Sequence, residues 1–180
     1  MKIFIIGPCS TGKSTLAQYL SQKLLIPYIC LDDLFIDFGS ITMSHHAYYP
    51  TEKVDENIRR VTELKNWIVE GPYAIDVFFE ESDLIVFTSR SLIRAIFWQW
   101  KRVFTDPLQL KRWGIINNLI LSKLIFHQYI DKSDTCLYQG VKYPTLANLK
   151  NRLHHFGDKV IILGARSNNR TLFKQLGLLE

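Results

Sequence analysis

Residues 7–14 read Gly7-Pro8-Cys9-Ser10-Thr11-Gly12-Lys13-Ser14, and they directly follow the apolar run Ile3-Phe4-Ile5-Ile6. A buried strand that enters a glycine-framed turn and continues into a helix is typical of a loop that binds phosphate through backbone N–H groups. The alternative is an ordinary strand–turn–helix with a glycine-rich connection. We predict a phosphate-binding loop, followed by a helix over residues 13–25.

Most residues of this loop have an expected part in binding nucleotide. Gly7 and Gly12 leave space where a Cβ would obstruct the turn or the phosphate. Lys13 is expected to reach the β- and γ-phosphates, and the Ser14 hydroxyl is expected to bind Mg²⁺. Cys9 could be a low-pKa thiol near a helix N-terminus, although a passive filler is favoured. The candidate nucleotide-binding residues are Gly7, Cys9, Ser10, Thr11, Gly12, Lys13, Ser14 and Thr15.

The composition suits one soluble domain over residues 1–180. The three cysteines lie far apart without a C-x-x-C pair, which favours a reducing compartment over a disulfide framework or a zinc site. The longest apolar stretch, residues 115–130, is interrupted by polar side chains, so no spanning helix is expected. These features predict a cytoplasmic protein without a membrane partner.

The charge is unevenly distributed along the chain. Its formal net value is +5, but residues 1–90 carry 8 Lys and Arg against 12 Asp and Glu, a balance of −4. Residues 91–180 carry 14 against 5, a balance of +9. A basic half could enclose a polyanion such as a phosphate chain or a nucleic acid, and it could equally be charge for solubility.

Short apolar runs alternate with helical patterns along the chain. The runs at 2–6, 28–31, 67–69, 83–87 and 160–163 predict five strands. Strands separated by helices favour a parallel sheet covered on both faces, and ligands bind such sheets beyond the carboxyl ends of the strands. Because the suggestive polar groups all follow strand ends, we expect them to converge on one site.

The segment from about 91 to 151 differs from this pattern. Residues 91–103 form a helix by their apolar period, Asp106-Pro107 breaks it, and residues 108–130 read as one or two further helices. No strand is evident before Val160. We therefore predict a helical, lid-like insert between the fourth and fifth strands.

Acidic residues follow two of the predicted strands. Glu70 could complete a metal shell through water or act as a base, and its alternative is a surface glutamate. Asp32 and Asp33 follow the second strand, where adjacent side chains point in opposite directions, so one of them should face the cleft. It could accept a proton from an acceptor hydroxyl, and the alternative is a helix N-cap for residues 34–38.

Basic residues follow the fourth and fifth strands. Arg90 and Arg94, with Lys101, form a stripe that could hold the transferring phosphoryl group or could be a solvated helix face. Arg166 could stack on adenine or could be an exposed arginine. The pairs His45-His46 and His154-His155 lack ligand spacing, and Trp98, Trp100 and Trp113 are expected to pack rather than stack on bases.

The chain resembles the adenylate kinase-like group of P-loop kinases, and within it the bacterial DNA topology modulation proteins. Four stretches carry the resemblance, over residues 1–102 and more weakly 158–176. The first is Ile5-Ile6-Gly7-Pro8 leading into Thr11-Gly12-Lys13-Ser14-Thr15-Leu16, and the second is Ile26-Pro27 with Leu31-Asp32-Asp33-Leu34-Phe35. The third is Trp67-Ile68-Val69-Glu70-Gly71-Pro72-Tyr73, and the fourth is Ser82-Asp83-Leu84-Ile85-Val86-Phe87 with Arg90.

This resemblance implies a three-layer αβα fold with parallel strand order 2-3-1-4-5. It implies ATP and Mg²⁺ as cofactors, γ-phosphoryl transfer to a small-molecule or nucleotide acceptor, and acceptor contacts from Asp32–Tyr49. Glu70 stands where the group usually has Asp. Residues 104–150 lack the arginine-rich lid pattern of adenylate kinases, which weakens the case for adenylate as acceptor.

The sequence is therefore compatible with two functions. The first is an ATP-dependent kinase with Lys13, Asp32, Asp33, Arg90 and Arg94 as candidate catalytic residues and Ser14 and Glu70 as the metal site. The second is a nucleotide-gated protein that binds nucleic acid through its basic half. The sequence contains neither an N-K-x-D element nor a D-x-x-G switch after the loop, which disfavours a GTPase.

Overall fold

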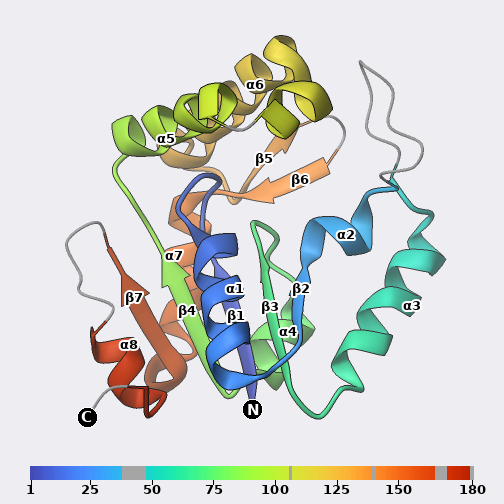
Figure 1. The fold of residues 1–180 in the computed structure, drawn as a ribbon, viewed down its shortest axis with the longest axis vertical. Helices are drawn as coiled ribbons and strands as arrows, with labels where there is room; N and C mark the ends of the chain where they lie inside the picture. Colours follow the sequence, from blue (N-terminus) through green and yellow to red (C-terminus); the bar gives the residue numbers. More distant parts are fainter. Residues whose placement is uncertain (38–47, 106, 139–140, 165–169, 179–180) are drawn as a thin grey trace.

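A five-stranded parallel sheet organises the chain in this computed structural model, which describes residues 1–37, 48–105, 107–138, 141–164 and 170–178 (Figure 1). Its strand order is β2-β3-β1-β4-β7. Because β5 and β6 are not part of this sheet, β7 is its fifth strand, and the order is the predicted 2-3-1-4-5. The strands are β1 (Lys2–Ile6), β2 (Tyr28–Cys30), β3 (Trp67–Gly71), β4 (Leu84–Thr88) and β7 (Val160–Leu163).

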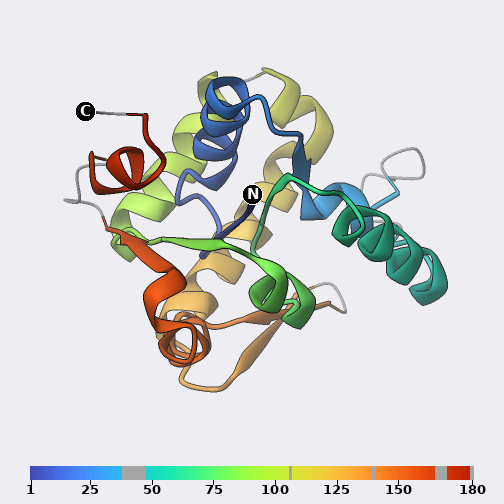
Figure 2. The ribbon, with the colours of Figure 1, turned by 90° about the horizontal axis from the view of Figure 1, so that it is seen from below.

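Helices cover both faces of this sheet (Figure 2). Because successive side chains of a strand point to opposite faces, Ile3 and Ile5 pack with Leu20, whereas Phe4 and Ile6 lie in the other core cluster. The first face is covered by α1 (Lys13–Leu24) and α8 (Arg170–Gln175), and the second by α4 (Asp76–Glu81) and α7 (Leu146–His154). The three-layer prediction is confirmed.

Two helices connect β2 to β3. The first, α2 (Leu31–Phe35), begins directly after β2, and the second is α3 (Thr51–Thr62). Gly71 ends β3 against α2, since a Cβ at Gly71 would lie 2.7 Å from Leu31 Cβ. This close approach places α2 over the carboxyl ends of β2 and β3.

The insert between β4 and β7 is not entirely helical, contrary to the prediction. After α5 (Leu92–Thr105) and α6 (Pro107–Ile130) come β5 (Thr135–Tyr138) and β6 (Val141–Pro144), which pair as an antiparallel hairpin. Each hairpin strand has only four residues, and β6 (Val141-Lys142-Tyr143-Pro144) has no continuous apolar run, so no strand was predicted there. Before β7, the 3-10 helix η2 (Gly157–Lys159) follows α7.

The second helix of the insert is continuous. Pro107 occupies its first position, where a missing backbone N–H removes no helical hydrogen bond. In the part of the chain that the structure describes, no helix is long and apolar enough to span a bilayer.

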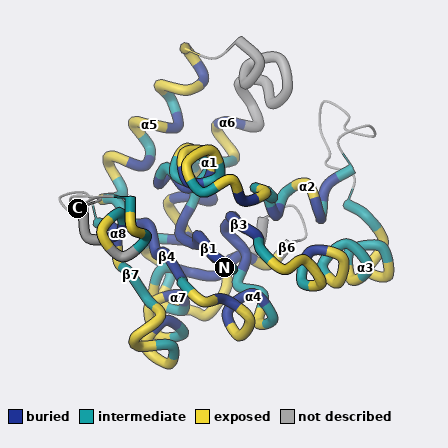
Figure 3. Tube along the Cα trace, turned by 60° about the horizontal axis from the view of Figure 1, so that its bottom comes forward, coloured by how far each residue is buried: buried dark blue, intermediate teal, exposed yellow. Residues whose placement is uncertain are grey.

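Helix α5 faces the molecule in an unexpected orientation. Its buried residues are Ala95, Gln99 and Val103, whereas Phe97 and Phe104 are 61% and 81% exposed (Figure 3). The apolar period of residues 91–103 therefore identifies the helix but not the face that it buries. The polar Gln99 is buried instead because it bonds to the phosphate loop, as described below.

Candidate functional site

The conformation of the loop between β1 and α1 depends on its two glycines, Gly7 and Gly12. A Cβ at Gly7 would lie 2.1 Å from the carbonyl oxygen of Thr88, so only glycine fits beside β4. Gly12 has φ +95° and forms the N-cap of α1 without a side chain to cap it. The first N–H groups of a helix lack intrahelical partners, so those of α1 can receive an anion.

Side-chain hydrogen bonds close the loop on itself and on β4. Thr11 Oγ1 donates to Pro8 O at 2.9 Å and lies 2.7 Å from Thr88 Oγ1. Ser10 has φ +60°, a strained value for a residue other than glycine. Thr15, also predicted to contact nucleotide, is exposed in the first turn of α1.

Lys13 is buried, and it is folded back over its own loop. Its Nζ donates to Pro8 O at 2.8 Å. Among the described residues, no carboxylate forms an ion pair with Lys13. A buried ammonium group whose recorded partner is a carbonyl oxygen is an electrostatic site for an anion.

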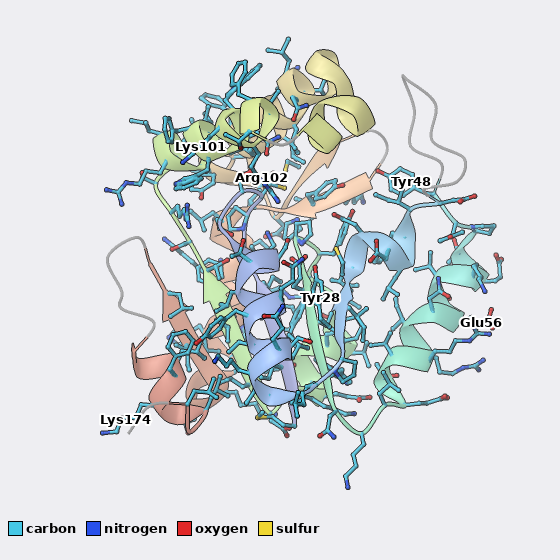
Figure 4. All side chains as sticks on the ribbon, in the orientation of Figure 1. Tyr28, Tyr48, Glu56, Lys101, Arg102 and Lys174 are labelled. Carbon is cyan, nitrogen blue, oxygen red and sulfur yellow. The ribbon has the colours of Figure 1, made fainter. Side chains whose placement is uncertain are left out.

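Ser14 and Glu70 meet at the base of the loop. Ser14 Oγ donates to Glu70 Oε1 at 2.9 Å, and Tyr28 Oη donates to the same oxygen at 3.0 Å (Figure 4). Glu70 is only 2% exposed, which excludes the surface-glutamate alternative. No ion pair to Glu70 occurs among the described residues, so this buried carboxylate is satisfied by neutral hydroxyl groups.

Asp32 is the aspartate of the pair that faces the site. It accepts a hydrogen bond from Tyr73 and lies within electrostatic reach of Lys13 and Glu70, whereas Asp33 is exposed. Burial, and then the negative charge of Glu70, raises the pKa of Asp32 to about 6. Both aspartates lie in the first turn of α2, whose N-cap is Cys30, so the N-cap alternative for residues 34–38 is wrong.

Arg90 lies beside the phosphate loop. A Cβ at Gly12 would be 3.2 Å from one guanidinium nitrogen of Arg90, and the guanidinium also lies 5.3 Å from the centroid of the Trp98 ring. Lys101 Nζ lies 4.6 Å from that centroid, so the Trp98 ring already has two cationic neighbours. Arg94 is exposed, and no recorded contact brings it to the loop.

Two buried glutamines of the insert bind the outer half of the loop, and the sequence analysis missed both. Ser10 Oγ donates to Gln99 Oε1 at 2.7 Å, and Gln99 Nε2 donates to Asn118 Oδ1 at 2.7 Å. The Cys9 N–H donates to Gln128 Oε1 at 3.1 Å. Their only sequence signal was a glutamine within an apolar helix.

Gln128 also carries a buried donor. It is fully buried, and its Nε2 has no hydrogen-bond partner among the residues that the structure describes. A buried amide donor beside a phosphate loop is a further group that an anion could satisfy.

Aromatic hydroxyl groups surround Asp32, and the sequence analysis assigned them no role. Tyr73 Oη and Tyr143 Oη are 3.1 Å apart, and the Phe35 ring stacks on Tyr73 with centroids 4.7 Å apart. Tyr48 lies near the end of β6 (Figure 4), and its buried hydroxyl group is within electrostatic reach of Tyr143. These residues come from α2, the hairpin, and the segments before α3 and after β3, so the fold alone assembles them.

The remaining predicted groups contribute little to this site. Burial raises the pKa of the Cys9 thiol to about 11, which supports the passive-filler interpretation. His154 and His155 are exposed, and within the described ranges no three His, Cys, Asp or Glu residues form a metal cluster. Arg166 and the His45-His46 pair lie outside the described residues, as does the side chain of Trp113.

Comparisons with known proteins agree with this architecture. No family model matches the chain. An adenylate kinase from Streptomyces griseus is 51% identical over 35 residues, which are 19% of this chain and 97% of that sequence.

Solved structures match over nearly the whole chain. Shikimate kinase from Bacteroides thetaiotaomicron superimposes with a TM-score of 0.52 at 17% identity, over 99% of each chain. A candidate kinase from Chloroflexus aurantiacus gives 0.55 at 12% identity, over 98% of this chain and 96% of that one. With its parallel sheet, strand order and phosphate loop, the chain belongs by fold to the P-loop kinases.

Proposed function

We propose that this protein is an ATP-dependent phosphotransferase that acts on a small acceptor in the cytoplasm. The observation that carries the proposal is the buried ammonium group of Lys13 at the start of α1, which donates to Pro8 O and forms no ion pair with any residue that the structure describes. A phosphate chain supplies the missing negative charge and the acceptor oxygens for the helix N–H groups.

The residues at the base of the loop fit a magnesium ion. Mg²⁺ prefers oxygen ligands, and Ser14 Oγ and the Glu70 carboxylate are side by side there. In the proposal Ser14 binds the metal and Glu70 orients its water ligands. Bound Mg²⁺ would neutralise charge on the phosphate oxygens.

In the proposal, the other steps of binding and phosphoryl transfer are assigned to the protein's own residues. Gly7 and Gly12 admit the phosphates, Lys13 neutralises them, and Arg90 stabilises the charge that develops on the transferring group. Asp32 receives the proton of the attacking hydroxyl group, for which a pKa of about 6 is suited. The catalytic role of Arg94, the adenine contact of Arg166 and the similarity to DNA topology modulation proteins stay predictions from the sequence.

The experiment measures transfer from ATP that is labelled in its γ-phosphoryl group. The purified protein, Mg²⁺ and a small-molecule cell extract are incubated, and labelled products are separated from ATP and phosphate. We expect acceptor-dependent labelling that Lys13→Ala abolishes and Lys23→Ala, on the exposed end of α1, retains. Labelling that survives Lys13→Ala would contradict the proposal.

A further inference from the structure

Helix α5 exposes its largest aliphatic and aromatic side chains and buries a polar one. Ile93, Phe97 and Phe104 are 80%, 61% and 81% exposed, whereas Gln99 is buried. A surface helix of a water-soluble domain normally has the opposite arrangement, with its apolar side toward the core. Large apolar side chains that gather on a surface mark a site of interaction.

The three exposed apolar residues, which we call the apolar stripe, share one side of the helix. They lie four and then seven residues apart, which is close to one turn and two turns of an α-helix. At the helical rise the stripe is about 16 Å long. On the other side of the helix, Gln99 bonds to Ser10 and Asn118, so buried hydrogen bonds hold the stripe outward.

Cationic side chains flank the apolar stripe. Arg94 and Lys101 are both exposed and lie seven residues apart, so they sit one above the other beside the stripe. Arg102 is a third exposed cation of α5 (Figure 4), and the helix has no acidic residue. Residues 90–130, which include α5 and α6, carry 7 Lys and Arg against 1 Asp, a balance of +6. This surface therefore combines apolar area with positive charge.

Helices α5 and α6 form one end of the molecule, opposite to both chain termini (Figure 1). Most residues of α5 are exposed or half-buried along its whole length (Figure 3). An extended flat surface can therefore reach the exposed side of this helix. A flat partner of negative charge fits such a side better than a deep pocket does.

We infer that α5 docks on a membrane surface that contains anionic lipids. The apolar stripe enters the boundary between headgroups and acyl chains, and Arg94 and Lys101 meet the lipid phosphates, as in helices that lie in the interface. The indole of Trp98, beside these cations, suits the headgroup level. The prediction of a protein without a membrane partner rested on spanning stretches, and a helix that lies in the interface does not span the bilayer.

Two other partners fit only half of this surface. A nucleic acid would pair with the cations through its phosphates, but it would set the rings of Phe97 and Phe104 against a charged backbone. A second copy of the chain would cover these rings, but symmetric pairing would bring Arg94 and Lys101 of both copies together. An anionic lipid surface accommodates the rings and the cations at the same time.

Vesicle sedimentation tests the inference with the full chain. The protein is mixed with vesicles of phosphatidylcholine alone, or of phosphatidylcholine and phosphatidylglycerol in equal amounts, and the bound fraction is measured after centrifugation. We expect binding to the anionic vesicles and at least about tenfold weaker binding to the neutral ones. Raising the salt concentration to about 0.5 M should weaken the binding, because it screens the cations.

Substitutions of exposed residues assign the binding to α5. The double variant Phe97→Ser/Phe104→Ser should lower the partition coefficient for anionic vesicles at least about tenfold, because two rings no longer leave water. Lys101→Gln should lower it about fivefold, the contribution of one basic residue near such a surface. Leu64→Ser and Lys65→Gln are the matched controls, since both residues are exposed in the connection between α3 and β3, and they should leave it unchanged.

The outcomes that contradict the inference are distinct. Wild-type protein that stays unbound with anionic vesicles, or binds neutral vesicles equally well, would overturn it without any variant. Full binding by the double variant would assign the membrane contact to another surface and overturn the inference. It would also be overturned if vesicles bound nothing while the double variant abolished a dimer, or Lys101→Gln weakened binding to duplex DNA.

Discussion

Asp32 combines a proposed catalytic role with a cost to stability. Its pKa of about 6 lies above the ordinary value of 3.8, so the folded protein disfavours the ionised carboxylate. In the folded state this group takes up a proton below about pH 6, whereas the unfolded chain does so only near pH 4. The contribution of Asp32 to the free energy of unfolding therefore increases as the pH falls from about 6 to about 4, and it is least favourable above about pH 6.

Asp32→Asn should accordingly stabilise the protein at neutral pH. The two pKa values set an upper limit of about 3 kcal/mol, and we expect the free energy of unfolding at about pH 7.5 to increase by about 1–3 kcal/mol. Urea titrations across the pH range would measure it. The gain should disappear by about pH 4, and a gain independent of pH would contradict this explanation.

Arg90 is expected to act on the reaction more than on nucleotide binding. Its guanidinium lies beside Gly12, where it can stabilise charge that appears only in the transition state. Arg90→Ala should lower kcat at least about tenfold and change the Kd for Mg-ATP less than about threefold. Arg102→Ala on the exposed side of α5 is the control, and an equal loss in both kcat and affinity would refute the assignment.

At this scale the sequence led us to expect that Ser14 and Glu70 converge, which their hydrogen bond confirms, but it gave no sign of the tyrosines around Asp32. Ser14 lies in α1 just after β1, and Glu70 lies near the carboxyl end of the adjacent parallel strand β3, so their proximity follows from the strand order. Tyr48 and Tyr143 are 95 positions apart, and no local pattern links them to Asp32.

The insert and the phosphate loop are joined by a buried polar chain. Gln99 is the central member, because it accepts from Ser10 and donates to Asn118. Gln99→Leu should leave buried polar groups without that partner and lower the free energy of unfolding by about 1–3 kcal/mol. Chemical denaturation would measure this change.

A matched variant on the same helix serves as the control. Phe97→Ser removes an exposed ring from α5 and should change the free energy of unfolding by less than about 0.5 kcal/mol. If Phe97→Ser destabilised the protein more than Gln99→Leu, the observed orientation of α5 would be contradicted.

The elements show where sequence periodicity failed. In α5 the apolar period identified the helix but not its buried residues, which are Ala95, Gln99 and Val103, with Gln99 hydrogen-bonded to Ser10 and Asn118. The hairpin of β5 and β6 is held by pairing between its own short strands and by its contacts with α6. Neither constraint is visible in a local window.

For the whole molecule, the alternation of strands and helices was sufficient to predict a parallel sheet covered on both faces, and the family resemblance added its strand order. Continuous apolar runs mark strands that are buried on both faces of a parallel sheet. The uneven charge has a structural counterpart, since the basic half includes α5 and α6 and the acidic half includes α2 and α3. Which of these charges face a bound acceptor depends on how the four helices are arranged in space.

Calorimetric titration of Mg-ATP into the folded protein tests the central claim most directly, with Lys13→Ala and Lys23→Ala as the paired variants. The account predicts a saturable heat for wild type and Lys23→Ala, and a Kd at least about tenfold higher for Lys13→Ala at unchanged thermal stability. No saturable heat with wild type at millimolar nucleotide, or equal affinity in all three proteins, would contradict it.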